Sequence, residues 1–215
     1  MSNNTRTHIT ELHDLGKGRA FIIISEPSAY QTFAQDLFAE ISQTTRCILL
    51  EVPVVTELNW KEITSSLLEY LLQKNIRQAS FVGFSDAASI VLNLALNDLK
   101  LVRSMVIVDA ATRAHPSVFQ RIVNRVENVL PLGLPLRSYD KGFDAESFLQ
   151  RMRCPVLVIT SQQAGAYIRS QTEVFKTGLP TAWSLSLSGQ NTAHELKDMI
   201  LDFQQTPAKC PQKNV

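Results

Sequence analysis

Ser85 stands where a strand-like segment meets a helix-like one, a place from which a hydroxyl can attack a carbonyl group. The apolar run Ala79 to Val82 leads into Gly83-Phe84-Ser85-Asp86-Ala87, and a helical pattern continues to Leu96. A serine at such a junction has two interpretations. It caps the helix, or it is a nucleophile beside a helix N-terminus that stabilises developing negative charge.

Three segments, in this order, resemble the α/β-hydrolase fold family. Gly83-Phe84-Ser85-Asp86-Ala87 is similar to its nucleophile elbow, G-x-S-x-G, with alanine in place of the last glycine. Phe148 to Ile159 looks like the approach to its seventh strand, and Ala193-His194-Glu195-Leu196 resembles the position of its catalytic histidine. The resemblance covers residues 7 to 205, with a shortened lid. It implies a strained turn that projects Ser85 above the sheet.

The same resemblance implies roles for a histidine and a carboxylate. His194, in the loop before the last helix, would be the base that takes the Ser85 proton, although such a histidine is otherwise a surface or capping residue. The loop after the strand Pro155 to Thr160, where most of the family has its acid, contains no carboxylate here. Asp109, at the end of the preceding strand, is the substitute that some members use. Its alternative role is a cap or a loop-organising carboxylate.

The oxyanion hole departs from the family pattern. Asp86 supplies one backbone N–H, as any residue would, but the second donor belongs just beyond the first core strand, where this chain has Ser25-Glu26-Pro27 instead of His-Gly. Pro27 has no N–H to donate, so the Ser28 N–H serves only if the register shifts. Glu26 would place negative charge beside the oxyanion unless it turns outward. The Asp86 carboxylate either matches the helix dipole or recognises a cationic group.

The elements that must position these residues alternate between short β-branched runs and helical patterns. Continuous apolar strands separated by amphipathic helices predict a mostly parallel sheet buried on both faces, hence a three-layer α/β/α fold. A polar-apolar segment at Thr7 to Leu12 predicts an antiparallel edge strand. Six core strands are predicted at Phe21 to Ile24, Cys47 to Leu50, Ala79 to Val82, Leu101 to Val108, Pro155 to Thr160 and Trp183 to Leu187. The predicted helices are Tyr30 to Ile41, Trp60 to Lys74, Asp86 to Leu96, Ala164 to Lys176 and Ala193 to Phe203, with Ser147 to Arg151 ending a short one.

We expect one domain over residues 1–205, followed by a flexible tail at 206–215. The segment 111–143 interrupts the alternation, because it holds an amphipathic helical pattern from Val118 to Leu130 that stops at Pro131. One interpretation is a lid inserted over a site at the strand ends. The other is a core helix with an ordinary connecting loop.

The composition of the chain disfavours several classes of function. The 215 residues include 21 Lys and Arg against 20 Asp and Glu, a formal charge of +1, without a block of like charge, which disfavours nucleic-acid binding. Three distant cysteines, Cys47, Cys154 and Cys210, suit reduced thiols in a cytoplasmic protein better than disulfides or zinc. No apolar run is long enough to span a membrane. No phosphate-binding loop, metal spacing or other cofactor motif is present, so we expect no metal and no cofactor.

Two functions remain. The first is a serine hydrolase that acts on an ester or thioester of a small-molecule acyl substrate, using Ser85, His194 and Asp109, with a lid covering an apolar acyl pocket. The second is a non-catalytic protein of the same fold that binds a small ligand or a protein partner. The missing acid, Glu26-Pro27 and the small number of glycines, 8 in all, favour the second. The oligomeric state is not predicted.

Overall fold

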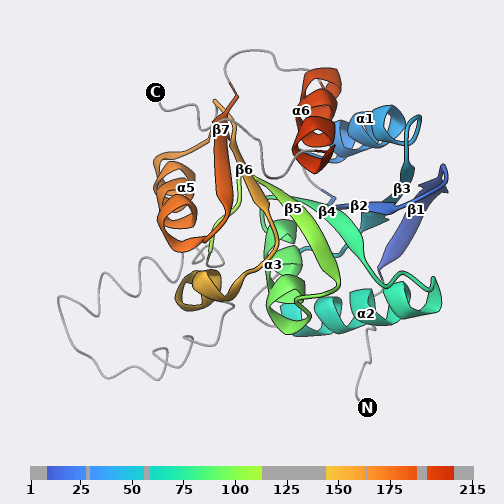
Figure 1. Cartoon of the computed structure of the whole chain (residues 1–215), viewed down its shortest axis with the longest axis horizontal. Coiled ribbons are helices and arrows are strands. Elements are labelled where there is room, and N and C mark those ends of the chain that lie inside the picture. Colours follow the sequence, from blue (N-terminus) through green and yellow to red (C-terminus); the bar gives the residue numbers. More distant parts are fainter. Residues whose placement is uncertain are drawn as a thin grey trace.

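Seven strands form one sheet with helices on both faces (Figure 1). The computed structural model describes residues 9–27, 30–55, 59–112, 144–162, 164–187 and 193–205, except for the side chains of 193–195 and 204–205. Within these ranges the elements are, in chain order, β1 (Thr10–Leu15), β2 (Ala20–Ser25), α1 (Gln31–Ile41), β3 (Arg46–Glu51), α2 (Trp60–Gln73), β4 (Ala79–Phe84), α3 (Ala87–Asn97), β5 (Val102–Val108), the 3-10 helix η2 (Glu146–Arg151), β6 (Val156–Thr160), α5 (Ala166–Gly178), β7 (Ala182–Ser186) and α6 (Ala193–Gln205).

The strand order is β1-β3-β2-β4-β5-β6-β7. Only β1 runs antiparallel to its neighbour, β3, and every other neighbouring pair is parallel. Parallel neighbours need a crossover, and the helices between the strands provide it. The predicted three-layer α/β/α architecture with a mostly parallel sheet is therefore confirmed.

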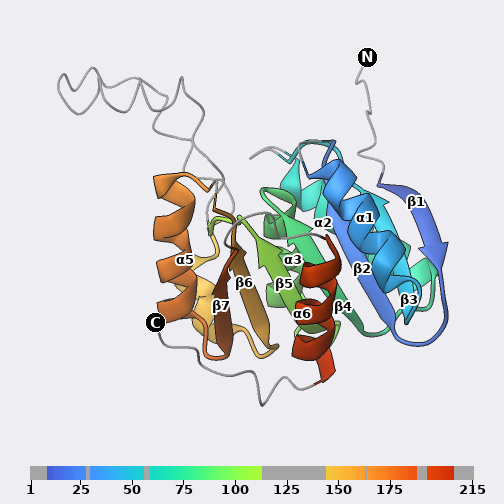
Figure 2. The same cartoon turned by 90° about the horizontal axis from the view of Figure 1, so that it is seen from above.

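The hydrophobic core has two layers, one on each face of the sheet. In β2, Ile22 and Ile24 pack with apolar residues of α2, α3 and α5, whereas Phe21 and Ile23 pack with those of α1 and α6. Figure 2 shows α1 and α6 together over one face of the sheet. Because successive side chains of a strand point to opposite faces, a strand buried on both sides must be mostly apolar, as β2 is from Ala20 to Ile24.

Most predicted bounds differ from the structure by one or two residues; one element differs by more, and one differs in helix type. The antiparallel edge strand exists, but it spans Thr10–Leu15, three residues later than predicted. Its position is set by pairing with β3, with a bulge between Glu11 and His13, and by an ion pair of 2.8 Å between Asp14 and Arg46. Ser147 to Arg151 lies in a 3-10 helix, η2.

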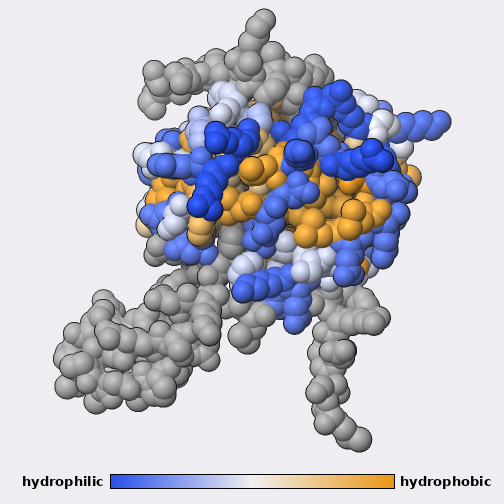
Figure 3. Space-filling model, turned by 60° about the horizontal axis from the view of Figure 1, so that its bottom comes forward, coloured by the Kyte–Doolittle hydropathy of each residue, from blue (hydrophilic) through white to orange (hydrophobic). Residues whose placement is uncertain are grey.

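The molecular surface is mixed in character. On the side seen in Figure 3, apolar side chains lie between hydrophilic ones. Some large apolar side chains are exposed, and Leu72 of α2 is 75% exposed. In the described part of the chain, no helix is both long and apolar enough to cross a bilayer. Most of the predicted lid, 113–143, and the predicted tail, 206–215, lie outside the described residues.

Candidate functional site

The strand order reverses between β2 and β4, which are neighbours in the sheet. The chain leaves β2 for α1 and β3 on one side, and leaves β4 for α3 and β5 on the other. In open α/β sheets, ligands bind beyond the carboxyl ends of the strands where the order reverses in this way. Ser85 follows β4 at this edge and Glu26 follows β2, so the fold brings two predicted site residues to neighbouring strand ends.

Ser85 forms a tight turn between β4 and α3. Its backbone φ is +49°, in the left-handed region that residues other than glycine adopt only at an energetic cost. The Ser85 N–H donates to the carbonyl oxygen of Val108 at the end of β5, at 2.8 Å. On the other side of the turn, the Ser85 carbonyl accepts from the Ala88 N–H at 3.2 Å, so the helix begins immediately. The strained conformation is thus held by hydrogen bonds on both sides.

Gly83 lets the strand and the helix approach each other closely. A Cβ added at Gly83 would lie 2.6 Å from the Cα of Ala88, well inside van der Waals contact. Ala87, two residues after the serine, is fully buried, so a larger side chain there has no free volume. Both positions therefore need small residues, as predicted.

Asp109 lies at the end of β5, the strand that receives the Ser85 hydrogen bond. It is 6% exposed and also adopts a positive φ, +48°. One carboxylate oxygen accepts from the Tyr30 hydroxyl at 2.5 Å and the other accepts from the Ser161 N–H at 2.7 Å. The carboxylate thus links the start of α1 to the turn after β6. This geometry fits the loop-organising role directly and leaves the proposed triad role as a prediction.

Tyr30 is a site residue that the sequence reasoning missed. Burial, and then the hydrogen bond to Asp109, raise the pKa of the Tyr30 hydroxyl well above its usual value, so the phenol stays protonated as the donor. Its ring stacks on Phe84, with 5.6 Å between the centroids. Tyr30 and Asp109 are 79 positions apart, and nothing in the sequence pattern pairs them.

Glu26 is half-buried, and its carboxylate accepts from the Val55 N–H at 3.3 Å. Burial raises the pKa of Glu26 to about 7, with a further contribution from repulsion by the Asp86 carboxylate. The two acidic residues therefore lie close enough to interact, one at each side of the strand-order reversal. Near neutral pH the Glu26 carboxyl is divided between its neutral and charged forms.

The residues around the predicted oxyanion position are only partly defined. Pro27 is exposed and brings no N–H, while Ser28 lies outside the described residues. Asp86 is the N-cap residue of α3 and is half-buried. The Ser25 hydroxyl, at the end of β2, is buried and has no hydrogen-bond partner among the described residues.

His194 lies in α6 as its second residue, rather than in the loop before the helix. The side chain of His194 is outside the described residues, so its predicted meeting with Ser85 stays a prediction. The helix itself is docked, because its Leu196, Ile200 and Phe203 are buried in the core layer shared with α1. Among the other histidines, His13 lies in the edge strand β1, away from the site. Its ring stacks on that of Phe38 in α1.

The two cysteines that the structure describes lie in the core. Cys47 and Cys154 are buried free thiols, and burial raises the pKa of Cys154 to about 11. Both thiols are therefore protonated near neutral pH. Within the described ranges, no three histidine, cysteine or carboxylate side chains gather as they would around a metal ion.

Several proteins of known structure share this architecture. No protein-family model and no curated protein matches the sequence. The chain is similar in structure to a thermophilic esterase from Thermogutta terrifontis solved with malate, with a TM-score of 0.70 and 12% identity over 95% of this chain and 96% of that one. It is also similar to a meta-cleavage product hydrolase from Pseudomonas fluorescens, with a TM-score of 0.69 and 14% identity over 93% and 94%. An enol-lactonase from Burkholderia xenovorans gives a TM-score of 0.67 and 14% identity over 94% and 98%.

These likenesses cover nearly the whole of each chain, and the seven-stranded sheet has the same mostly parallel build. At this level of identity they establish the architecture. The chain has the α/β-hydrolase fold.

Proposed function

We propose that the protein is a serine hydrolase that cleaves an ester or thioester of a small acyl substrate, with Ser85 as the nucleophile. The observation that carries this proposal is the backbone of Ser85 at φ +49°, on a turn held by hydrogen bonds to Val108 and Ala88. A serine that only capped a helix would have an ordinary extended conformation and no need of strain. A strained turn of this kind is the way a nucleophile is raised above a sheet.

The proposed reaction has two halves. The Ser85 oxygen adds to the carbonyl carbon while the His194 imidazole takes its proton, and the carbonyl oxygen becomes an oxyanion beside the Asp86 N–H. The imidazolium then gives the proton to the leaving alkoxide or thiolate as the bond to it breaks, which leaves Ser85 acylated. Water, deprotonated by the imidazole, releases the acid and restores the hydroxyl.

Asp109 is the carboxylate that would orient the imidazole. Its two oxygens accept from Tyr30 and Ser161, but a carboxylate has about four lone-pair sites, so each oxygen retains one for a further donor. Because Asp109 is fixed by these two bonds and almost fully buried, it would hold the imidazole with little loss of its own freedom. The order Ser85, Asp109, His194 along the chain is that of the fold family.

The proposed substrate class rests on the fold and on the predicted lid. The similar structures include an esterase and a lactonase, which supports hydrolysis at an acyl carbon as the chemistry. The predicted lid helix, Val118 to Leu130, would supply the apolar wall of an acyl pocket, and it lies outside the described residues. The location of a second oxyanion donor, the Ser28 N–H, stays a prediction for the same reason.

A specific observation favours a second candidate, a non-catalytic binding protein. Pro27 lacks the N–H that would complete the oxyanion hole, and losing one such donor costs about 10²–10³ in turnover. Glu26 beside Asp86 would also oppose negative charge on a substrate oxygen whenever it is ionised. A protein with these residues could use the same strand ends to hold a ligand without cleaving it.

Labelling with a fluorophosphonate separates the two candidates. An activated Ser85 should react with the probe, and both the label and the hydrolysis of a short-chain p-nitrophenyl ester should disappear in Ser85→Ala. His194→Gln should abolish them as well, because the hydroxyl then has no base.

Ser170→Ala is the matched control, since Ser170 is an exposed serine on α5 whose hydroxyl donates to the Tyr167 carbonyl. It should label like the parent protein. Absence of labelling between about pH 6 and 9, with the circular dichroism spectrum intact, would identify the binding protein instead.

A further inference from the structure

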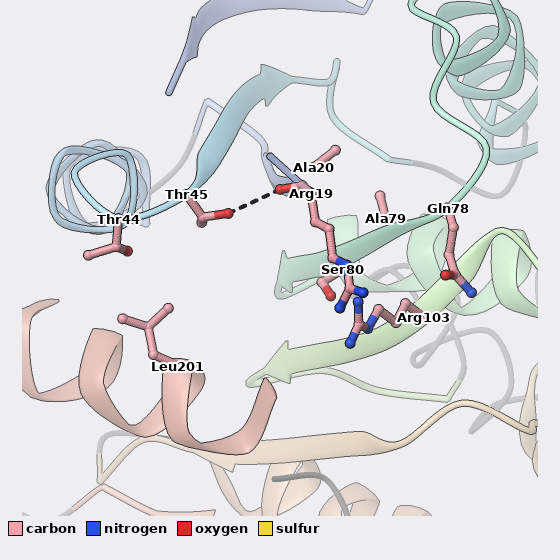
Figure 4. A pocket seen from close by; sticks show the side chains of 9 residues that line it. All are labelled: Arg19, Ala20, Thr44, Thr45, Gln78, Ala79, Ser80, Arg103 and Leu201. Carbon is pink, nitrogen blue, oxygen red and sulfur yellow. Dashed lines mark hydrogen bonds between the residues drawn. The ribbon is translucent and has the colours of Figure 1, made fainter. Parts of the chain in front are cut away.

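A pocket lies at the opposite edge of the sheet from Ser85. Its volume is about 640 Å³, and it sits between the amino ends of β2, β4 and β5, the turn before β3, and α6 (Figure 4). The residues that line it are Arg19, Ala20, Thr44, Thr45, Gln78, Ala79, Ser80, Arg103 and Leu201. Neither the proposed nucleophile nor any of its neighbours at the carboxyl ends of the strands belongs to this pocket.

Two arginines give the pocket its charge. The guanidinium groups of Arg19 and Arg103 both extend into it beside Ser80 (Figure 4). Among the described residues, no carboxylate forms an ion pair with either of them. Arg46 at the same edge of the sheet is different, because it forms two hydrogen bonds to Asp14, of 2.8 and 3.0 Å. The pocket therefore concentrates positive charge that the described residues do not neutralise through an ion pair.

Polar groups with hydrogens to donate lie beside the two guanidiniums. The Ser80 hydroxyl shares a hydrogen bond of 2.9 Å with the Ser104 hydroxyl, and when Ser104 donates it, the Ser80 hydrogen remains for a ligand. The Gln78 amide uses one hydrogen on the Lys100 carbonyl at 3.3 Å and has a second. By contrast, the Thr44 and Thr45 hydroxyls already donate to backbone carbonyls.

We propose that this pocket binds the phosphate group of a small phosphate monoester. Planar guanidinium groups bind phosphate through paired N–H···O bonds, and a dianion with three terminal oxygens can engage both arginines while it accepts from Ser80. A phosphate alone fills only part of 640 Å³, which leaves room for the organic part of an ester. The two like charges also repel each other when the pocket holds only water, so an anion between them relieves this repulsion.

Calorimetric titration with inorganic phosphate, acetate and a simple phosphate monoester such as glycerol phosphate tests the proposal. We expect saturable binding of both phosphates at millimolar or lower concentrations, weakening as sodium chloride is added, and clearly weaker binding of acetate. Arg19→Gln and Arg103→Gln, which keep most of the side-chain length, should each weaken phosphate binding by about tenfold or more.

Arg77→Gln is the matched control, because Arg77 is an exposed arginine at the same edge that does not line the pocket. It should leave phosphate affinity within about twofold of the parent protein. Ser85→Ala should also bind phosphate normally, so this test is independent of the proposed hydrolase activity. The proposal is overturned if acetate binds as well as phosphate, if Arg77→Gln weakens binding as much as Arg103→Gln, or if the parent protein binds no phosphate.

Discussion

At Asp109, an isosteric substitution can separate the observed loop-organising role from the proposed triad role. Asparagine can still accept from the Ser161 N–H, and its amide can donate to the Tyr30 oxygen, so most of the local hydrogen bonding survives. It cannot stabilise an imidazolium or fix its tautomer. We therefore expect Asp109→Asn to keep its melting temperature within a few degrees while kcat falls by at least about 10², toward the 10⁴ seen for this change in a serine protease.

The reference variant is Tyr30→Phe, which keeps the carboxylate and removes one of its donors. It should lower the free energy of unfolding by roughly 1–3 kcal/mol, because a buried charged acceptor loses a partner. Ester hydrolysis and thermal unfolding of both variants would be measured together. If Asp109→Asn hydrolyses the ester as fast as the parent protein, Asp109 is only a loop-organising residue and the acid lies elsewhere.

Glu26 makes stability depend on pH. The pKa of Glu26 is raised to about 7, against an ordinary value of 4.5. Between these values the folded protein holds a proton that the unfolded chain has released, so the free energy of unfolding falls as pH rises through this interval. Glu26→Gln removes the effect. We expect it to melt at a higher temperature than the parent protein at pH 8, and at about the same temperature at pH 4.

Melting curves across this pH range, recorded beside Glu69→Gln on the exposed face of α2, check the expectation. The Glu69 variant should follow the parent protein at every pH. A Glu26→Gln variant that gains nothing above pH 7 would mean that the carboxyl ionises as it does in water.

At the scale of the residue, the sequence predicted those features of the site that depend on residues adjacent in the chain. Ser85, Gly83 and Ala87 form one local turn, so their pattern predicts its small-residue requirement, and the structure agrees. Tyr30 was missed because its partner is 79 positions away. Ser85 and His194 are also far apart in the sequence, so a sequence pattern alone cannot test whether their side chains meet.

At the scale of the element, Gly83 joins β4 to α3. Adding a methyl group there brings it to 2.6 Å from the Ala88 Cα, which is backbone and cannot move without shifting the helix. We expect Gly83→Ala to lower the free energy of unfolding by about 1–3 kcal/mol, measured by urea denaturation, and to reduce any labelling of Ser85 because the turn is displaced.

Gly165→Ala provides the comparison. Gly165 is the N-cap residue of α5, with φ −65° and no heavy atom within 4 Å of an added Cβ. Its substitution should leave stability within about 1 kcal/mol of the parent protein. Equal losses in the two variants would show that the close approach of β4 and α3 is unimportant.

Element types were predictable because each element is long enough to show a period. The buried strands are mostly apolar runs, and the helices show an apolar stripe. The bounds of β1 were displaced because its pairing with β3 depends on Arg46 and on a bulge, neither of which has a signal near residue 10. The 3-10 geometry of η2 likewise follows from packing, since its Leu149 is buried against α5.

At the scale of the whole molecule, the sheet separates two regions of different chemistry. Its carboxyl edge holds the strained Ser85, Asp109 and the acidic pair Glu26 and Asp86, whereas its amino edge holds the pocket with Arg19 and Arg103. The predicted layer architecture was confirmed because alternating strands and helices admit few arrangements. The basic pocket was not predicted, since its residues come from five separate segments that only the fold brings together.

The central position of β2 has a consequence for the nascent chain. Both neighbours of β2, the strands β3 and β4, are made after it, and β4 follows only when α1, β3 and α2 have been synthesised. On the ribosome, this mostly apolar strand must therefore wait with one edge open until Phe84 has emerged from the exit tunnel. During that interval its open edge is exposed to pairing with another chain, which a chaperone that covered it would prevent.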